Sequence, residues 1–262
     1  MNWIILCMLS VVLVCAIADP AAAADFTIST DRPGILYGTS IVPVGHWQLE
    51  AGLPTWQRSD SDGERDTLIT TPTYVRYGVA DNLELQIADS PYSRETIHTG
   101  FGGTTFTGAS DVTFGAKLLL HSGAAHGPNI VLVGYATLPT GSDAFSAGSP
   151  GYNLNLVSGW SLTESTNIAA MVSFSRIPIA GDRHADNGIL AMNLAHSFSD
   201  RLAAYLETGW FPGFSNAQDQ ALFGAGLTWL VTHRFQLDSF FDRGLNNASP
   251  DWTAGVGASI LF

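Results

Sequence analysis

Charged side chains are scarce in this chain of 262 residues, at 13%, against roughly 25% in an average soluble domain. A water-exposed surface usually needs about 25–35% charged residues, so this scarcity disfavours an ordinary soluble globule. Beyond residue 18, no apolar run approaches the roughly 18 residues of a spanning helix, which excludes a helical membrane bundle. The hydrophobic content of 46% excludes disorder, because disordered chains are poor in apolar residues.

Cysteine is nearly absent, and both cysteines, Cys7 and Cys15, lie in the first segment. An apolar stretch over residues 3–18, followed by small residues up to Ala24, predicts a signal peptide over residues 1–24. No Lys or Arg precedes that stretch, and a membrane anchor is the alternative, although the stretch is shorter than a spanning helix. The exported chain would begin at Asp25 and could form no disulfide.

Basic residues are few: 11 Lys and Arg stand against 23 Asp and Glu, giving a net charge of −12. Phosphate backbones are bound by clustered Lys and Arg. The balance therefore argues against nucleic acid as a partner.

The dominant pattern from Val44 to Phe262 is an alternation of apolar and polar residues with period two, which is typical of strands whose two faces differ. In the first such segment Trp47 and Leu49 point one way while Gln48 and Glu50 point the other. The pattern predicts about twelve strands. They cover residues 45–53, 67–77, 83–87, 112–118, 130–138, 152–162, 168–174, 188–198, 202–211, 220–230, 235–241 and 252–262.

The connections between these strands alternate in length. Short ones cover 78–82, 163–167, 199–201 and 232–234, and long ones cover 57–66, 92–108, 139–150, 178–187, 212–219 and 244–251. Short periplasmic turns and long extracellular loops are typical of outer-membrane barrels. One connection, residues 121–128, is longer than its assigned side predicts.

A sheet can span lipid only when it closes on itself, because every backbone polar group must be paired there. The outward residues would then face hydrocarbon and the inward residues a polar lumen. Tryptophans recur near the strand ends, where an aromatic belt would lie; they are Trp47, Trp56, Trp160, Trp210, Trp229 and Trp252. The alternative fold is a soluble β-sandwich or lipocalin-like barrel, whose polar face would have to be built with very few charges.

Motifs at both ends of the exported chain resemble one family. They are Asp31-Arg32-Pro33-Gly34, residues 42–52, Arg76-Tyr77-Gly78-Val79, Leu83-Glu84-Leu85, Asp242-Arg243-Gly244-Leu245-Asn246, residues 249–252 and residues 255–257. The series is similar to the outer-membrane transporters of the phenol meta-cleavage (MetA) degradation pathway. Residues 92–211 carry no matching motif.

That resemblance implies passage of aromatic or other apolar small molecules across the bacterial outer membrane. The last residue, Phe262, closes an alternating strand from Trp252. It resembles the assembly signal read by the barrel-insertion machinery, so this machinery and the outer-membrane lipid are the expected partners, besides the permeant.

Opposite charges occupy inward positions on several predicted strands: Glu50, Arg76, Glu84, Asp111, Lys117, Glu207 and Asp238. In a narrow lumen they would either select permeants by charge or pair with one another as a structural network. An unpaired charge there would cost several kcal/mol, so partners are expected. Glu50, Arg76 and Glu84 are the candidates for selectivity because they also lie in the matched motifs.

The segment that holds Asp31, Arg32 and Pro33 precedes the first strand. It could fold into the lumen or cap its periplasmic mouth, and the alternative is a flexible tail. Because the segment carries one of the matched motifs, we expect a plug-like role for residues 25–43, followed by a barrel over 44–262.

Enzyme chemistry finds little support in the sequence. No Gly-x-Ser-x-Gly motif is present, and the His-Ser pairs at 121 and 196 have no orienting acid at a recognisable spacing. The nearest histidines, His121 and His126, lie among glycines, so no metal and no cofactor is expected.

The sequence thus predicts an all-β outer-membrane barrel that gives small molecules a passive path, and not an enzyme. Two alternatives stay open. One is a non-conducting structural or adhesive barrel that acts through loops such as residues 92–108, and the other is a barrel-fold hydrolase.

Overall fold

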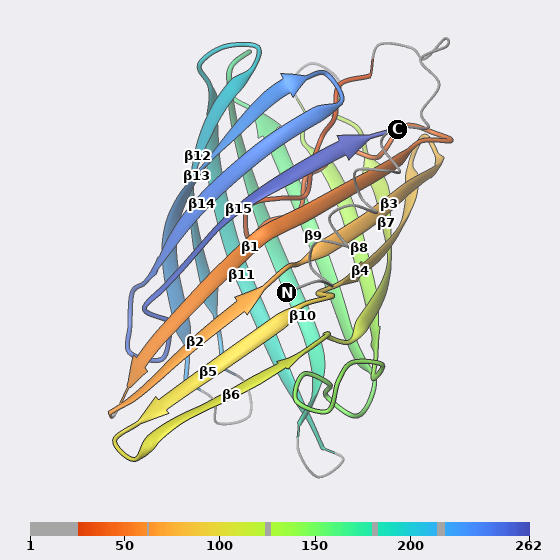
Figure 1. Cartoon of the computed structure of the whole chain (residues 1–262). Coiled ribbons are helices and arrows are strands. Elements are labelled where there is room, and N and C mark those ends of the chain that lie inside the picture. The colour runs from red at the N-terminus through yellow and green to blue at the C-terminus, as the bar shows by residue number, and fades with distance from the viewer. Residues whose placement is uncertain (1–25, 62, 124–126, 180–182, 214–217) are drawn as a thin grey trace.

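The computed structural model consists of one antiparallel sheet that closes on itself (Figure 1). It describes residues 26–61, 63–123, 127–179, 183–213 and 218–262. The predicted signal peptide, residues 1–24, and the start at Asp25 lie outside these residues. In the described part of the chain, no helix has the length and apolar character needed to cross a membrane.

Twelve strands form the closed wall, since β1 pairs with both β3 and β15. The all-β barrel of about twelve strands predicted from the alternation is confirmed. The wall strands are β1 (Trp47–Ser61), β3 (Thr73–Ala80), β4 (Leu83–Asp89), β7 (Val112–His121), β8 (Asn129–Leu138), β9 (Gly151–Ser161), β10 (Thr166–Ile179), β11 (Arg183–Ser197), β12 (Leu202–Phe211), β13 (Gln220–Thr232), β14 (Phe235–Gly244) and β15 (Trp252–Leu261).

Three further strands extend the sheet beyond the long-loop rim: β2 (Glu64–Thr70), β5 (Ser93–Thr99) and β6 (Gly102–Gly108). They pair in the order β1, β2, β5, β6 and project at the lower left of Figure 1. The prediction of long loops over 57–66 and 92–108 is wrong here, because these residues form strand hairpins. Polar and glycine-rich strands outside lipid need no apolar face, so the alternation that marks a half-buried strand is weak in them.

Two other strand boundaries differ from the prediction. The single strand expected over 67–77 is split at Thr71 and Pro72 into β2 and β3. Proline has no N–H to donate to the ladder, so it stands between the strands. The loop expected over 178–187 is mostly strand, since β10 and β11 pair out to Ile179 and Arg183.

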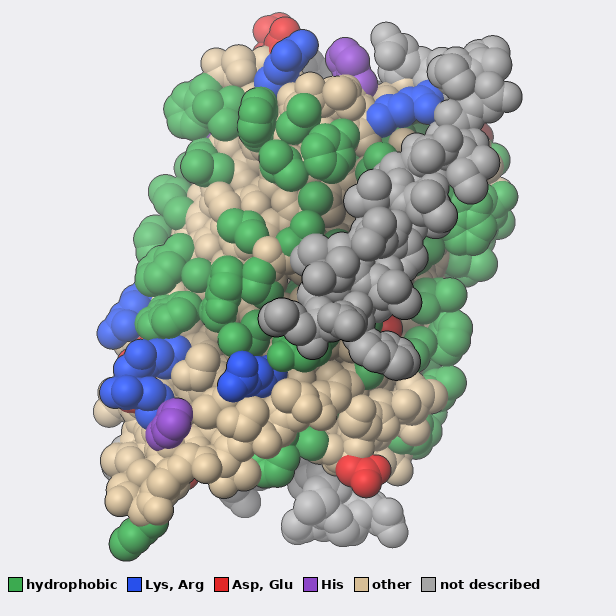
Figure 2. All heavy atoms as spheres, in the orientation of Figure 1, with side chains coloured by type: hydrophobic (Ala, Val, Ile, Leu, Met, Phe, Trp, Pro, Cys, Tyr) green, Lys and Arg blue, Asp and Glu red, His purple; other side chains and the backbone are tan. Residues whose placement is uncertain are grey.

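The outer face of the wall is apolar (Figure 2). Alternate residues of the strands expose large hydrophobic side chains, among them Leu85, Leu154, Val172, Leu206 and Val256, each 44–56% exposed. In water, such a continuous apolar surface would be a site of association with other molecules. In a bilayer, the same surface contacts the hydrocarbon chains of the lipids. Tryptophans flank the face at both rims: Trp47, Trp160 and Trp229 near the short turns, and Trp56, Trp210 and Trp252 near the long connections.

The barrel closes at its two ends in sequence. β1 and β15 are antiparallel with Gln48 opposite Leu261, and the N–H of Phe262 donates to the Trp47 carbonyl at 2.8 Å. Closure leaves no unpaired edge along the wall. The proposed recognition of Phe262 during assembly stays a prediction.

Candidate functional site

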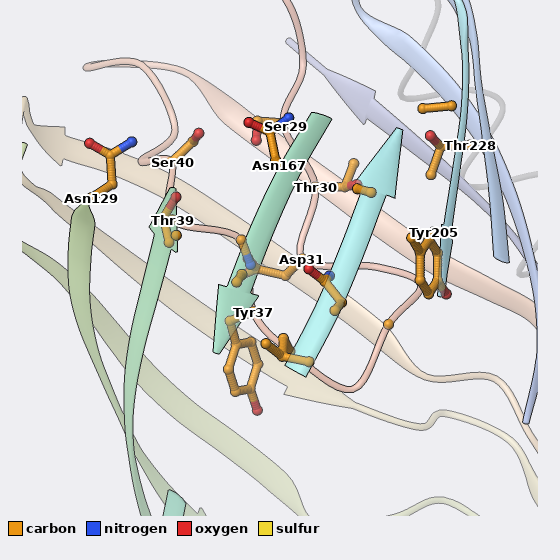
Figure 3. A pocket seen from close by; sticks show the side chains of 18 of the residues that line it. Ser29, Thr30, Asp31, Tyr37, Thr39, Ser40, Asn129, Asn167, Tyr205 and Thr228 are labelled. Carbon is orange, nitrogen blue, oxygen red and sulfur yellow. The ribbon is translucent and has the colours of Figure 1, made fainter. Parts of the chain in front are cut away.

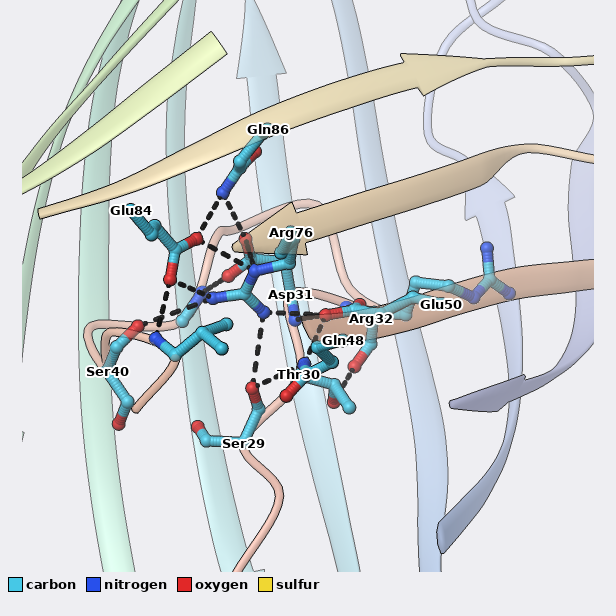
Figure 4. A network of polar contacts seen from close by, with 12 residues as sticks. Ser29, Thr30, Asp31, Arg32, Ser40, Gln48, Glu50, Arg76, Glu84 and Gln86 are labelled. Carbon is cyan, nitrogen blue, oxygen red and sulfur yellow. Dashed lines mark hydrogen bonds and ion pairs between the residues drawn. The ribbon is translucent and has the colours of Figure 1, made fainter. Parts of the chain in front are cut away.

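The chain before the first strand lies inside the barrel (Figure 4). Residues 26–46 form no strand, apart from one bridge between Val44 and Gly78. We call residues 28–42 the luminal segment; its apolar side chains Ile28, Leu36 and Val42 are buried. At Gly78 the segment passes so close to the wall that a Cβ would collide with the carbonyl oxygens of Val42 and Pro43, so a glycine is required there.

Glu50 on β1 binds the backbone of this segment. Its alternation with outward Leu49 and Ala51 directs the carboxylate into the lumen, where it is fully buried. The N–H of Asp31 donates to Oε1 and Oε2 of Glu50 at 3.1 and 3.0 Å, and the N–H of Arg32 donates to Oε2 at 2.9 Å. Hydrogen bonds to a charged acceptor are among the stronger ones in proteins.

Arg76 on β3 joins two carboxylates from the neighbouring strands. Its Nη1 lies 2.6 Å from Oε1 of Glu50, and its Nε and Nη2 donate to the two oxygens of Glu84 on β4 at 2.8 and 2.9 Å. The second contact is bidentate, the geometry that the planar guanidinium favours. The N–H of Val42 also donates to Glu84, at 2.7 Å.

Lys117 on β7 completes the cluster. Its Nζ lies 2.5 Å from Oδ1 of Asp31, 3.0 Å from the carbonyl of Gly38 and 3.8 Å from Oε1 of Glu84. Arg76 Nε is 3.5 Å from the other oxygen of Asp31. We call Asp31, Glu50, Arg76, Glu84 and Lys117 the luminal network.

The electrostatics of Asp31 follow from these contacts. Burial by itself would raise the pKa of the Asp31 carboxyl, but the charges of Arg76 and Lys117 outweigh it, helped by hydrogen bonds from Lys117 and Gly38, and they hold this pKa below its usual value. The two acids and two bases of the wall balance, so Asp31 adds one surplus negative charge. The backbone N–H groups of Asp31, Arg32 and Val42 compensate for that surplus.

The luminal segment then crosses to the opposite wall. Arg32 Nη2 is 3.3 Å from Oδ1 of Asp238 on β14, and the N–H of Ile35 donates to Glu207 on β12 at 2.7 Å. The Arg32 guanidinium lies against Gly257, where a Cβ would come within 2.7 Å of Nη2. Leu36 packs in a buried apolar cluster with Val131, Val133 and Val157 of β8 and β9. The segment is therefore attached to both halves of the wall.

The structure separates the seven predicted lumen residues into groups. Glu50, Arg76, Glu84 and Lys117 meet in one network, whereas Glu207 and Asp238 contact the segment one by one. Asp111 belongs to neither group, because it precedes β7 and accepts hydrogen bonds from the N–H groups of Gly141 and Ala147 at 2.8 and 2.9 Å. Its assignment to the lumen network is wrong: the carboxylate holds the connection between β8 and β9.

Three neutral residues that extend the luminal network by hydrogen bonds were not predicted: Gln48, Gln86 and Tyr135. Gln48 and Gln86 donate to Glu50 and Glu84 at 2.7 and 2.6 Å, and the Tyr135 hydroxyl donates to Gln86. All three occupy inward positions of their strands and are buried. Inward polar residues next to a charged one were the signal that could have identified them.

A cavity of about 560 Å³ lies beside the luminal segment, toward the short-turn rim (Figure 3). Its lining is mostly uncharged and comes from the segment and from β8 to β14; it includes Ser29, Thr39, Asn129, Asn167, Tyr205 and Thr228. The charged residues on its lining, Asp31 and Arg32, are both ion-paired. A space of this volume accommodates a small organic molecule.

Within the described residues, no group of three or more His, Cys, Asp or Glu is arranged to hold a metal ion. Asp31, Glu50 and Glu84 are paired with Arg76 and Lys117, Asp238 is paired with Arg32, and Glu207 accepts from a backbone N–H group. The charged residues of the lumen therefore hold the luminal segment in place, and the segment bounds the cavity beside it.

A closed antiparallel wall with an apolar outside and a polar inside is the architecture of an outer-membrane β-barrel. The chain belongs to the family described as "Putative MetA-pathway of phenol degradation", whose model matches residues 30–262. A comparison with curated proteins finds no match.

Solved structures of other outer-membrane proteins have the same fold. An outer membrane channel from Pseudomonas putida has a TM-score of 0.67 at 16% identity, over 88% of this chain and 99% of that chain. The KdgM porin has a TM-score of 0.54 at 11% identity, over 82% and 99%. The beta domain of the Bordetella autotransporter BrkA has a TM-score of 0.54 at 13% identity, over 82% and 98%. The barrel fold of this protein thus matches that of outer-membrane proteins of Gram-negative bacteria.

Proposed function

We propose that the protein is a passive channel for small uncharged molecules, in particular aromatic ones, and not an enzyme. The observation that carries the proposal is the cavity of about 560 Å³ with a mostly uncharged lining inside the barrel. Asn129, Asn167 and Thr228 offer hydrogen bonds to a hydroxyl group, while Ala169, Ala195 and Gly159 give a permeant apolar contact. The family description, which refers to phenol degradation, fits a permeant of this kind.

The luminal network acts in this proposal by holding the segment in place. Glu50, Arg76 and Glu84 have no exposed surface, so a permeant does not touch them while the segment is bound. Their effect on selectivity passes through Asp31, Arg32 and Val42, because Glu50 and Glu84 accept from the N–H groups of these residues. Arg76 holds the two carboxylates in place. The segment thereby limits both the size and the charge of what passes.

The test compares three aromatic solutes of one size that differ in charge: 3-hydroxybenzyl alcohol, 3-hydroxybenzoate and tyramine. Flux into proteoliposomes is measured by swelling, with protein-free liposomes subtracted. We expect the neutral alcohol to pass fastest. Equal exclusion of all three solutes would contradict the proposal.

A narrowed variant locates the path. Ala195 lies on β11 and lines the cavity, so Ala195→Trp should fill part of it and lower the flux of the neutral solute severalfold. The matched control is Leu194→Trp, one residue along the strand, because Leu194 is 45% exposed on the outer face. Equal fluxes of the two variants would show that the path lies elsewhere.

A second candidate function is that of a non-conducting adhesive barrel. It is favoured by the extension of β2, β5 and β6, where β6 is an edge strand whose residues Gly102–Thr107 are exposed. An exposed edge can add a strand from another chain. Absent flux together with binding of cells or peptides to this edge would support it.

A further inference from the structure

Four arginines gather on the outer face at the long-loop end of the barrel. They are Arg58 on β1, Arg65 on β2, Arg94 on β5 and Arg243 on β14, and we call them the arginine patch. Figure 2 shows basic side chains at the left of the molecule, in the region of β1 and the projecting strands. Only 11 Lys and Arg occur in the whole chain, so this is a large share of its positive charge.

The strand register explains why these side chains share one face. Arg58 and Arg243 are both paired with Trp252 of β15, from its two sides. Arg65 is paired with Asp60, two residues along β1 from Arg58, and Arg94 is paired with Ile69 of β2. Paired residues point to the same side of a sheet, and Trp252 lies on the outward face with Val256.

The patch borders the apolar band of the barrel. Two residues nearer the short-turn rim than Arg58 and Arg243, the same face carries Trp56 and Phe241, and Ile69 is paired with Trp56. Phe241 stacks on Trp252 with ring centroids 6.4 Å apart. Trp47, nine residues before Trp56, marks the other rim. The bulge between Gly52 and Thr55 leaves eight ladder steps between Trp47 and Trp56. At about 3.3 Å per residue and a tilt near 40°, the two tryptophans are roughly 20 Å apart along the membrane normal, within the ~25 Å of an outer-membrane apolar band. The arginines therefore lie at the level of the outer-leaflet headgroups.

Carboxylates neutralise only part of the patch. Asp60 accepts from Arg58 Nη2 and Arg65 Nε, each at 2.8 Å, and Asp251 is 3.9 Å from Arg243 Nη2. Asp60 and Asp251 both lie on the side of the patch that is farther from the apolar band. Arg94 makes no ion pair with any described residue. On this face four positive charges stand against two negative ones, whereas Asp66 and Glu95 lie on the opposite face of β2 and β5. The outer face therefore carries a positive patch on a chain whose net charge is −12.

We propose that the arginine patch binds the phosphate groups of outer-leaflet lipopolysaccharide. Guanidinium groups bind phosphate through parallel N–H donors, and the row of Trp56, Ile69 and Phe241 beside them gives the acyl chains an apolar surface. Lipopolysaccharide carries phosphate groups and acyl chains in one molecule, and this combination matches a row of basic side chains next to a row of apolar ones. The charge and the depth of the patch favour a phosphorylated lipid over a soluble anion.

The test uses the folded full-length chain in detergent and deep-rough lipopolysaccharide as the probe. We expect the Arg58→Gln/Arg94→Gln/Arg243→Gln variant to bind it at least about tenfold more weakly, since it loses several charge-assisted hydrogen bonds. The control variant, Arg201→Gln/Arg234→Gln, changes two arginines at the turns of the opposite rim and should bind as the wild type does. The heat-dependent shift of the barrel in gel electrophoresis verifies folding of each variant.

Further probes separate the sources of phosphate. Dephosphorylated lipopolysaccharide, phosphatidylglycerol and inorganic phosphate should each bind more weakly than the intact lipid. Asp60→Asn should tighten binding, because it releases Arg58 and Arg65 from their shared carboxylate. Wild-type affinity in the triple variant, an equal loss in the control variant, or equal affinity for any of the three probes would overturn the proposal.

Discussion

The luminal network and the arginine patch use the same chemical groups in opposite surroundings. In the lumen, the Arg76 side chain is 1% exposed and its partner Glu84 is 0% exposed. On the outer face, Arg65 and Asp60 are 54% and 42% exposed, although their contact has the same length, 2.8 Å. Distance therefore does not distinguish the two ion pairs, but burial does.

Burial changes what such a pair contributes. A charge removed from water depends on its partners, so the loss of one partner leaves an uncompensated charge. An exposed pair is solvated and screened, and either member can exchange its partner for a ligand. The luminal network is thus suited to holding the segment permanently, and the arginine patch to binding lipid from outside.

The largest effect is expected for Arg76→Gln. The change leaves Glu50 and Glu84 buried with fewer donors, and it should lower the free energy of unfolding by about 3–5 kcal/mol. Urea unfolding in lipid vesicles, followed by tryptophan fluorescence, measures this difference. If the free energy of unfolding falls by less than about 1 kcal/mol, water reaches the luminal network. The luminal network and the arginine patch would then not differ in burial.

A smaller loss of stability but a clear change in conduction is expected for Asp31→Asn. Lys117 loses its ionic partner while hydrogen bonds to the amide can remain, so the cost is about 1–3 kcal/mol. With the segment less firmly held, we expect single-channel conductance in planar bilayers to rise severalfold. Asp60→Asn is the matched control, since this exposed carboxylate lies far from the lumen, and its conductance should equal that of the wild type.

The pH dependence of conduction sharpens the same comparison. Because the folded-state pKa of Asp31 lies below its usual value, its ionised form stabilises the bound segment above the ordinary Asp pKa of about 3.9. That stabilisation is lost as the pH falls through the lower folded-state value. Asp31 faces Arg76 and Lys117, which stay charged, together with Glu50 and Glu84, which share these cations.

The contribution of Asp31 to conductance should therefore be constant between about pH 5 and pH 7, and its loss should raise conductance below about pH 4. In the Asp31→Asn variant the part of this rise that belongs to Asp31 should be missing. A profile of the variant that coincides with that of the wild type would show that Asp31 does not carry the acid response.

The smallest effect is expected for Arg58→Gln by itself. Arg58 pairs with Asp60 at the surface, and isolated surface pairs contribute little to stability. The free energy of unfolding in detergent without lipopolysaccharide should stay within experimental error of the wild type. A loss as large as that of Arg76→Gln would mean that exposure does not separate the two regions.

The wall of the barrel followed from the sequence because period-two alternation is a local signal. Leu49 and Glu50, or Leu85 and Glu84, differ in polarity since one faces lipid and the other the lumen. The extension of β2, β5 and β6 did not follow, because polar residues and glycine are frequent on both of its faces and the alternation is weak there.

The luminal site was predictable only in part. The inward direction of Glu50, Arg76, Glu84 and Lys117 could be derived from alternation, but their partners could not. Pairing of Asp31 with Lys117 joins residues 86 positions apart, and nothing in the local pattern encodes that contact. Asp111 shows the opposite kind of error. Its position in the alternation predicts an inward side chain, but the carboxylate binds the connection between β8 and β9.

The sequence by itself determined the class of this protein: few charges, no long apolar run and a persistent alternation admit a closed sheet in lipid and little else, because each strand must satisfy hydrocarbon on one side and water on the other. Only the tertiary structure decided what fills the lumen and where the arginines gather. Those features depend on which distant strands become neighbours, since ring closure and strand register bring together charges that the chain order keeps apart.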